Sequence, residues 1–209
     1  MKIGITGGIG SGKSYVCQRL KLRGIEVYDC DAAAKRLIRT SPIIYKELTA
    51  LIGPDAYIKG EEQETNGDRM LNKAAVARFL LESEANAKAI DAIVHPAVFR
   101  DFKQSGIEWM ESAILYESGI CQLVDRSVVV TAPDEVRIQR VMQRDGISRE
   151  KVLQWMQRQW PQAEVRRRAD YEIINDGVAD IDAQIDSLLK AIGNATTGNT
   201  TTEQITLTK

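Results

Sequence analysis

The sequence predicts an α/β fold: an open, mostly parallel, five-stranded sheet with helices on both faces. Short runs rich in β-formers alternate with longer stretches of helical periodicity, and the first of these runs ends in a glycine-rich loop that leads into a helix. Such alternation is typical of parallel strands joined by crossover helices. Ligands of these sheets bind beyond the carboxyl ends of the strands, so we expect a site there.

The five predicted strands span residues 2–6, 25–28, 107–115, 127–131 and 171–174. Helices are expected directly after the glycine-rich loop and at residues 32–38, 134–144, 149–159 and 181–192. A chain of 209 residues suits one domain with a subdomain. We therefore predict a single domain of residues 1–192, whose core comprises residues 1–40 and 106–192.

Residues 41–105 differ in character from the core and predict a helical insertion. Helical stretches there surround a polar loop at residues 60–67. A long amphipathic run begins at Glu84 and is expected to be interrupted at Pro96, because the residue before a proline avoids the α region. Residues 193–209 are rich in Gly, Asn and Thr and predict a flexible tail.

Composition excludes several classes of protein. The 28 basic and 29 acidic residues give a formal charge of −1, which argues against a broad nucleic-acid interface. One histidine and the absence of a C-x-x-C pair argue against a zinc site, and three scattered cysteines are typical of reduced thiols. The sequence contains neither a signal-peptide pattern nor a run approaching the roughly 20 apolar residues of a membrane span. We therefore expect a cytoplasmic protein that does not associate with a membrane and has no obligate protein partner.

A phosphate-binding motif lies between the first strand and the first helix. Residues 7–14 read GGIGSGKS and match the pattern G-x-x-x-x-G-K-[ST]. Glycines let successive backbone N–H groups curl around phosphate oxygens, and the positive end of the helix points at the same anion. Lys13 adds a mobile positive charge, and the Ser14 hydroxyl suits Mg²⁺ that bridges the terminal phosphates. The predicted ATP-binding residues here are Gly8, Ile9, Gly10, Ser11, Gly12, Lys13, Ser14 and Tyr15. The motif leaves hydrolysis, switching and transfer open.

Two carboxylates follow the second strand and so emerge at the edge of the sheet that carries the phosphate loop. Asp29 and Asp31 are both candidates for a base that orients an attacking hydroxyl. Asp31 also precedes three alanines and could be the N-cap of the next helix instead. The residue types alone leave the two interpretations of Asp31, base and N-cap, evenly balanced.

Other polar residues allow similar pairs of interpretations. Arg137, Arg140 and Arg144 share a helix face and could stabilise charge on a transferring phosphoryl group, or could form a solvated, salt-bridged face. Glu111 could support Mg²⁺ through water, or could be a simple strand-end acid. His95 could contact a ligand, or could cap or pack. The run Arg166-Arg167-Arg168 is more typical of a surface than of a ligand clamp.

In this order and spacing, the motifs resemble the dephospho-coenzyme A kinase family over residues 1–192. The resemblance rests on residues 5–14, on Asp29-Cys30-Asp31 followed by Lys35-Arg36-Leu37, on residues 93–96 and 115–119, on Arg137, Arg140 and Arg144-Asp145-Gly146, and on Ala169-Asp170 with Asn175-Asp176-Gly177. The sequence departs from the family pattern at Glu111, Ala113 and Trp155, where Asp, Pro and a lid arginine are usual.

The resemblance implies a P-loop kinase fold in which residues 41–105 bind the coenzyme and residues 134–168 form a mobile lid. It implies Mg²⁺-dependent transfer of the ATP γ-phosphoryl group to the ribose 3′-hydroxyl of dephospho-coenzyme A, giving coenzyme A and ADP, the last step of coenzyme A synthesis. The implied roles are base for Asp31, phosphate contact for Arg140 beside Lys13, proximity to adenine for Asn175, and coenzyme binding for His95 and Glu117. Another small-molecule or nucleotide kinase, or a nucleotide-dependent switch module, is the alternative.

Overall fold

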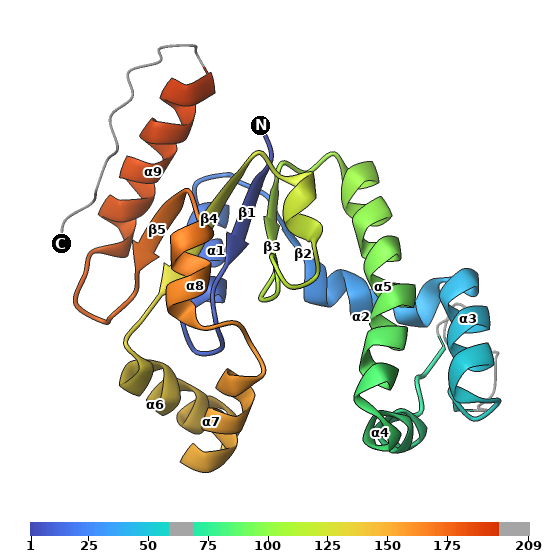
Figure 1. Ribbon diagram of the computed structural model, residues 1–209. Coiled ribbons are helices and arrows are strands. Elements are labelled where there is room, and N and C mark those ends of the chain that lie inside the picture. The colour runs from blue at the N-terminus through green and yellow to red at the C-terminus, as the bar shows by residue number, and fades with distance from the viewer. Residues whose placement is uncertain (59–68, 197–209) are drawn as a thin grey trace.

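The computed structural model describes residues 1–58 and 69–196. Its centre is a five-stranded sheet in the order β2-β3-β1-β4-β5, and all its strand pairs are parallel (Figure 1). The strands are β1 (Ile3–Thr6), β2 (Val27–Asp29), β3 (Trp109–Glu111), β4 (Arg126–Thr131) and β5 (Tyr171–Ile174). The predicted α/β class and five strands are confirmed.

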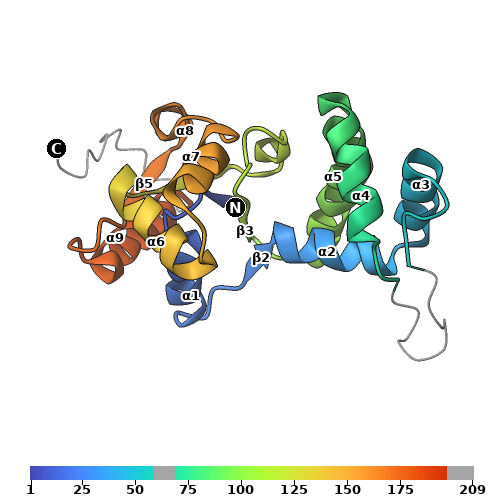
Figure 2. The same ribbon diagram turned by 90° about the horizontal axis from the view of Figure 1, so that it is seen from below.

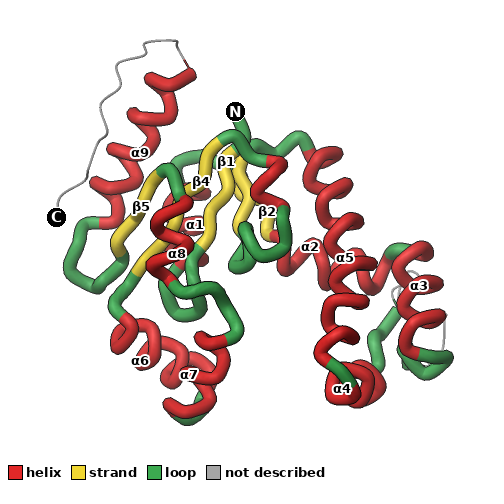
Figure 3. Tube along the Cα trace, in the orientation of Figure 1, coloured by secondary structure: helices red, strands yellow, loops and turns green. Residues whose placement is uncertain are grey.

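Helices lie on both sides of the strands (Figure 3). They are α1 (Lys13–Lys21), α2 (Cys30–Thr40), α3 (Pro42–Ile52), α4 (Lys73–Glu82), α5 (Glu84–Ser105), α6 (Asp134–Asp145), α7 (Arg149–Gln157), α8 (Gln162–Arg168) and α9 (Ile181–Thr196), with a 3-10 helix at Ile120–Leu123. No helix in the described ranges is both long and apolar enough to cross a bilayer.

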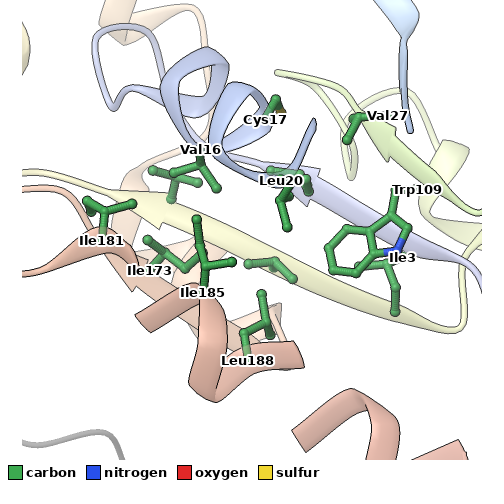
Figure 4. Packing of buried hydrophobic residues seen from close by; sticks show 13 residues of the cluster. Ile3, Val16, Cys17, Leu20, Val27, Trp109, Ile173, Ile181, Ile185 and Leu188 are labelled. Atoms are coloured by element: carbon green, nitrogen blue, oxygen red, sulfur yellow. The ribbon is translucent and has the colours of Figure 1, made fainter. Parts of the chain in front are cut away.

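One face of the sheet packs against α1 and α9. Ile3 on β1 and Ile173 on β5 meet Val16 and Leu20 of α1 and Ile185 of α9, and these side chains are buried (Figure 4). Burying such aliphatic side chains stabilises the fold by roughly 1.5–3 kcal/mol each. This layer fixes α1, and with it the lysine and serine of the phosphate loop, against the sheet.

A second apolar cluster joins β2 and β3 to α2 and α5. Tyr28, Phe102, Met110 and Leu115 are buried there. Helices α3 and α4 then pack on α5 away from the sheet, so α2 to α5 form a group beside the core (Figure 2). Helices α3, α4 and α5 of this group lie within residues 41–105, and α2 connects them to the sheet.

The predicted interruption at Pro96 is wrong, because α5 runs through this residue. Proline removes one helical hydrogen bond and disfavours helix at the preceding residue. Buried side chains on both sides of it, Val94, Val98 and Phe102, hold the two halves of α5 against the same neighbours. Packing therefore overrides the local preference.

Three predicted boundaries also shift. Strand β3 is shorter than residues 107–115, because the Ser112 hydroxyl accepts a hydrogen bond from the Ile114 N–H at 3.3 Å and starts a turn. Helix α7 ends at Gln157, shortly before a proline, rather than at residue 159. Helix α9 continues past Ile192 to Thr196, so the first part of the predicted tail is helical. The rest of that tail and the predicted loop at residues 60–67 lie outside the described residues.

Candidate active site

The phosphate loop has a backbone that favours glycine. Gly10 and Gly12 have φ angles of 78° and 91°, in the left-handed region. A Cβ on Gly12 would lie 2.0 Å from Asn175 Nδ2, and one on Gly8 would lie 2.2 Å from Arg137 Nη2. The glycines therefore permit both the tight curvature of the loop and the close approach of the Asn175 and Arg137 side chains to it.

Lys13 lies folded against this loop. Its Nζ donates to the Gly7 carbonyl at 2.8 Å and lies 3.7 Å from Glu111 Oε1. Burial lowers the pKa of Lys13, while Glu111 and Asp31 act in the opposite direction. Burial also raises the pKa of Glu111, and Lys13 opposes that shift. The lysine and the strand-end acid are thus an electrostatically coupled pair at the base of the site.

The arginines of α6 divide into distinct roles. Arg137 is buried, and its Nε donates to the Ile9 carbonyl at 3.0 Å. Arg140 donates from Nη1 to the Asn175 carbonyl at 2.9 Å and from Nη2 to Asn175 Oδ1 at 3.3 Å. Arg144 is exposed and pairs with its neighbour Asp145. The phosphate loop therefore has two arginines beside it, and the third belongs to a solvated, salt-bridged surface.

Two further side chains hold the loop. Asn175 Nδ2 donates to the Ser11 carbonyl at 2.9 Å, and Gln159 Oε1 accepts from the Ile9 N–H at 2.8 Å. Sequence reasoning identified Asn175 through the resemblance but missed both Gln159 and the deep position of Arg137. Equal spacing on α6 does not tell which arginine is buried. Gln159 lies just past α7 with no local pattern to mark it.

Asp29, rather than Asp31, is the N-cap of α2. Its Oδ1 accepts from the Ala32 N–H at 2.8 Å. The cap interpretation of Asp31 is therefore wrong. Asp31 lies in the first turn of α2, is exposed, and its charge acts on Lys13. Its carboxylate is available to a ligand on the phosphate-loop side.

A cavity of about 170 Å³ opens beside the loop, lined by Ser14, Cys17, Gln18, Lys21, Val27, Asp29 and Glu111. A hydroxyl and two carboxylates thus share one cavity, and Mg²⁺ prefers oxygen ligands of this kind. Among the described residues, no group of three or more His, Cys, Asp and Glu side chains is placed to hold a metal ion on its own. Mg²⁺ is commonly held by one or two carboxylates together with substrate phosphates.

Glu117 lies against the segment that follows α7. Its Oε1 accepts from the Trp160 N–H at 3.2 Å. The Trp160 ring stacks on Tyr116 with centroids 6.3 Å apart, and the Arg168 guanidinium lies 4.8 Å from the Trp160 ring centre. Gln159 and Trp160 therefore connect the phosphate loop with the loop that carries Glu117.

His95 lies on α5, and its described contacts are with its own helix. Its ring stacks on Phe99 with centroids 6.3 Å apart, and Nε2 lies 3.5 Å from Asp91 Oδ1. The packing role is present, and ligand contact stays a prediction. Trp155, on α7, packs with the buried Ile138 and Val152. The arginine run is a surface, as predicted, in which Arg166 pairs with Glu172 and both Arg167 and Arg168 pair with Glu164.

The parallel sheet and the glycine loop that leads into α1 define a P-loop nucleotide-binding protein. The chain belongs to the dephospho-CoA kinase family, because the family model described as Dephospho-CoA kinase matches residues 1–180. A relative of that name from Bacteroides fragilis is 40% identical over 196 residues, covering 90% of this chain and 91% of the relative. One from Chlorobaculum tepidum is 33% identical over 200 residues, covering 91% and 94%.

Solved structures give the same result for the fold. TT1252 from Thermus thermophilus is similar with a TM-score of 0.77 and 33% identity, over 92% of this chain and 97% of that one. The dephospho-CoA kinase from Campylobacter jejuni has a TM-score of 0.60 at 19% identity, over 95% and 100%. A shikimate kinase from Acinetobacter baumannii in complex with shikimate has 0.53 at 15%, over 93% of each chain. The last two are likenesses of fold alone, and the predicted P-loop kinase fold is confirmed.

Proposed function

We propose that this protein transfers the γ-phosphoryl group of ATP to the ribose 3′-hydroxyl of dephospho-coenzyme A, giving coenzyme A and ADP. Family membership supports the substrates. The observation that carries the mechanism is the placement of Asp31, an exposed carboxylate whose charge acts on Lys13 of the phosphate loop. This reaction makes the protein a phosphotransferase with an alcohol acceptor, and the proposed location is the cytoplasm.

The phosphate loop and the side chains beside it bind the donor. Backbone N–H groups of residues 8–14 hold the phosphates, and Lys13 turns from the Gly7 carbonyl toward the β and γ phosphates. Arg140, now bound to Asn175, is positioned to meet the charge that spreads over the transferring group. Tyr15 flanks the loop at the start of α1, and Asn175 lies toward adenine.

Asp31 acts on the acceptor. Its carboxylate accepts the proton of the 3′-hydroxyl as the oxygen attacks the γ-phosphorus. The new oxygen–phosphorus bond forms while the bond between the γ-phosphorus and its bridging oxygen breaks, so ADP leaves with that electron pair. His95 and Glu117 bind the rest of the acceptor. Positioning and charge stabilisation supply most of the rate enhancement.

Mg²⁺ would be held by Ser14 together with donor phosphates, with Glu111 acting through water. The ion supplies neutralisation of the charge that develops on the phosphate oxygens. Asp29 lines the same cavity as these two residues and keeps α2 in place through its cap.

Product analysis tests the proposal. The purified protein is incubated with ATP and Mg²⁺ together with dephospho-coenzyme A, AMP, UMP or shikimate in turn, and products are identified by mass spectrometry. Coenzyme A is expected as the predominant phosphorylated product. Preference for AMP, UMP or shikimate would establish a different kinase, and ATP hydrolysis without any phosphorylated acceptor would favour a switch module.

Asp31→Asn tests the proposed base. The structure predicts unchanged stability and ATP affinity, because Asp29 makes the cap, while turnover falls by roughly two to four orders of magnitude. Asp29→Asn is the matched control, since Asn caps about as well as Asp and should leave turnover within a few fold. If Asp31→Asn retains more than about a third of wild-type turnover and Asp29→Asn does not, the base is Asp29.

A further inference from the structure

Helix α2 connects the proposed reaction centre with the helical insertion. It begins at Cys30, immediately after β2, carries Asp31 in its first turn, and extends from the sheet toward α3, α4 and α5 (Figure 2). Residues four apart on a helix are neighbours on one face, separated by about 6 Å along the axis. The residue that shares the Asp31 face one turn further on is Lys35, and both are exposed.

Lys35 differs from the arginine beside it. Arg36 points to α5, where its Nη2 lies 2.5 Å from Asp101 Oδ2, the oxygen that also accepts from Tyr28 Oη at 2.6 Å. Lys35 forms no ion pair with any acid in the parts of the chain that the structure describes. One cation of α2 is thus used within the fold, and the other faces solvent beside the proposed base.

The acceptor has an anion at a matching position. In dephospho-coenzyme A the 3′-hydroxyl and the 5′-pyrophosphate are attached to one ribose, separated by C3′, C4′ and C5′ of the sugar. When Asp31 contacts the hydroxyl, the 5′-phosphate comes within reach of a lysine one helical turn away. A flexible lysine stem with three donors suits a diphosphate, which offers several oxygens in different directions.

We infer that Lys35 binds the 5′-pyrophosphate of the acceptor and so selects acceptors that carry a 5′-phosphate over neutral nucleosides. The inference rests on the proposed function and on the assignment of Asp31. A charge that contacts only the phosphate discriminates between these acceptors without changing the chemical step. Lys35 is therefore a specificity-determining residue, and its removal is expected to act on KM rather than on kcat.

The rival explanation is local. Asp31 and Lys35 have the spacing of a helix-stabilising ion pair, so the lysine could act through the carboxylate alone. In that case its loss would change kcat, and it would affect charged and neutral acceptors equally. The two explanations therefore differ in measurable ways.

The test compares Lys35→Gln, Lys35→Arg and the control Lys190→Gln, which removes an exposed lysine on α9, away from the insertion. For Lys35→Gln we expect the KM for dephospho-coenzyme A to rise about tenfold or more while kcat stays within about threefold. Its KM should also depend less on ionic strength than that of the wild type. Lys35→Arg should recover most of the affinity, and Lys190→Gln should match the wild type.

Adenosine is the neutral probe, measured by its inhibition constant against dephospho-coenzyme A. That constant should be the same for wild type and Lys35→Gln. An unchanged KM for dephospho-coenzyme A, a loss confined to kcat, or an equal weakening of adenosine would each overturn the inference. Failure of the wild type itself to form coenzyme A would instead refute the proposed function.

Discussion

The two sides of the proposed site are held together by different forces. Around the phosphate loop, Arg137, Asn175 and Gln159 bind backbone atoms of the loop directly. In the insertion, apolar side chains dominate, such as Ile44 and Leu48 of α3, which pack in a cluster with residues of α5. The donor side is therefore ordered by polar contacts within the protein, and the acceptor side is ordered by packing.

This difference has a consequence for binding. A loop already held by side chains loses little conformational freedom when phosphate arrives. On the acceptor side, Asp31 and Lys35 are exposed, and the ring contact and ion pair of His95 are with Phe99 and Asp91 of its own helix. Polar contacts there must form with the substrate. Changes to packing should thus disturb the insertion, and changes to polar groups should disturb the phosphate loop.

The largest expected effect is from Phe102→Ala. Phe102 is fully buried at the junction of α5 with the sheet and packs against Tyr28. Its loss should lower the free energy of unfolding by about 3–5 kcal/mol, measured by urea denaturation. ADP affinity of the folded fraction should be unchanged. Leu81→Ala, at an exposed position on α4, should cost almost nothing. A small loss at Phe102 would contradict packing as the main force on this side.

Lys13→Ala should act on the donor side and on catalysis. Removing the charge should lower turnover at least a hundredfold, about 2.7 kcal/mol of barrier. Steady-state kinetics with saturating substrates measures this, and Lys190→Ala on α9 is the control. Near-normal activity of a folded Lys13→Ala protein would remove the phosphate loop from the mechanism.

Asn175→Leu tests whether polar contacts order the loop. Leucine has a similar size but cannot bond the Ser11 carbonyl or Arg140, so unfolding free energy should fall by about 2 kcal/mol. ADP affinity should fall severalfold as well. Asn72→Ala removes the N-cap of α4 at a cost of about 1 kcal/mol and should leave ADP affinity unchanged. Equal ADP affinities in both variants would show that the phosphate loop does not need the Asn175 contacts to bind the nucleotide.

The contrast also explains what the sequence alone could predict. The phosphate loop could be predicted because its residues are contiguous in the sequence. The strands could be predicted because burial on both faces of the sheet leaves apolar runs. The contact between Gln159 and Ile9 joins positions 150 residues apart, so no local pattern encodes it. The path of α5 through Pro96 depends on neighbours in the same way. The strand order was not predicted.

The acceptor residues were suggested mainly by the resemblance. Residue types alone left Asp31 balanced between base and cap, and the hydrogen bond from the Ala32 N–H to Asp29 Oδ1 assigns the cap to Asp29. His95 and Glu117 are half-buried, and no local sequence pattern encodes what they contact. Their roles depend on a ligand, and so they stay predictions.

The smallest expected effect belongs to the ion pair of Arg36 and Asp101 in the insertion. Burial tends to raise the pKa of Asp101, but hydrogen bonds from Arg36 and Tyr28 outweigh it and hold this pKa below its usual value. The pair is partly exposed, so solvent screens it. Asn in place of Asp101 keeps an acceptor for the tyrosine and loses only the charge. Asp101→Asn should therefore lower the unfolding free energy by less than about 1 kcal/mol at pH 7.

The pH dependence gives this prediction a sign. A carboxyl whose pKa is depressed on folding contributes stability above its unfolded pKa, and that contribution is lost as pH falls through its folded pKa. The difference between wild type and Asp101→Asn should stay constant from pH 7 to about pH 5 and shrink below about pH 4. Urea or thermal unfolding across this range measures it, with Asp55→Asn, at a more exposed pair, as the control. A difference above roughly 2 kcal/mol, or one that grows on acidification, would mean that polar contacts hold the insertion as firmly as they hold the phosphate loop.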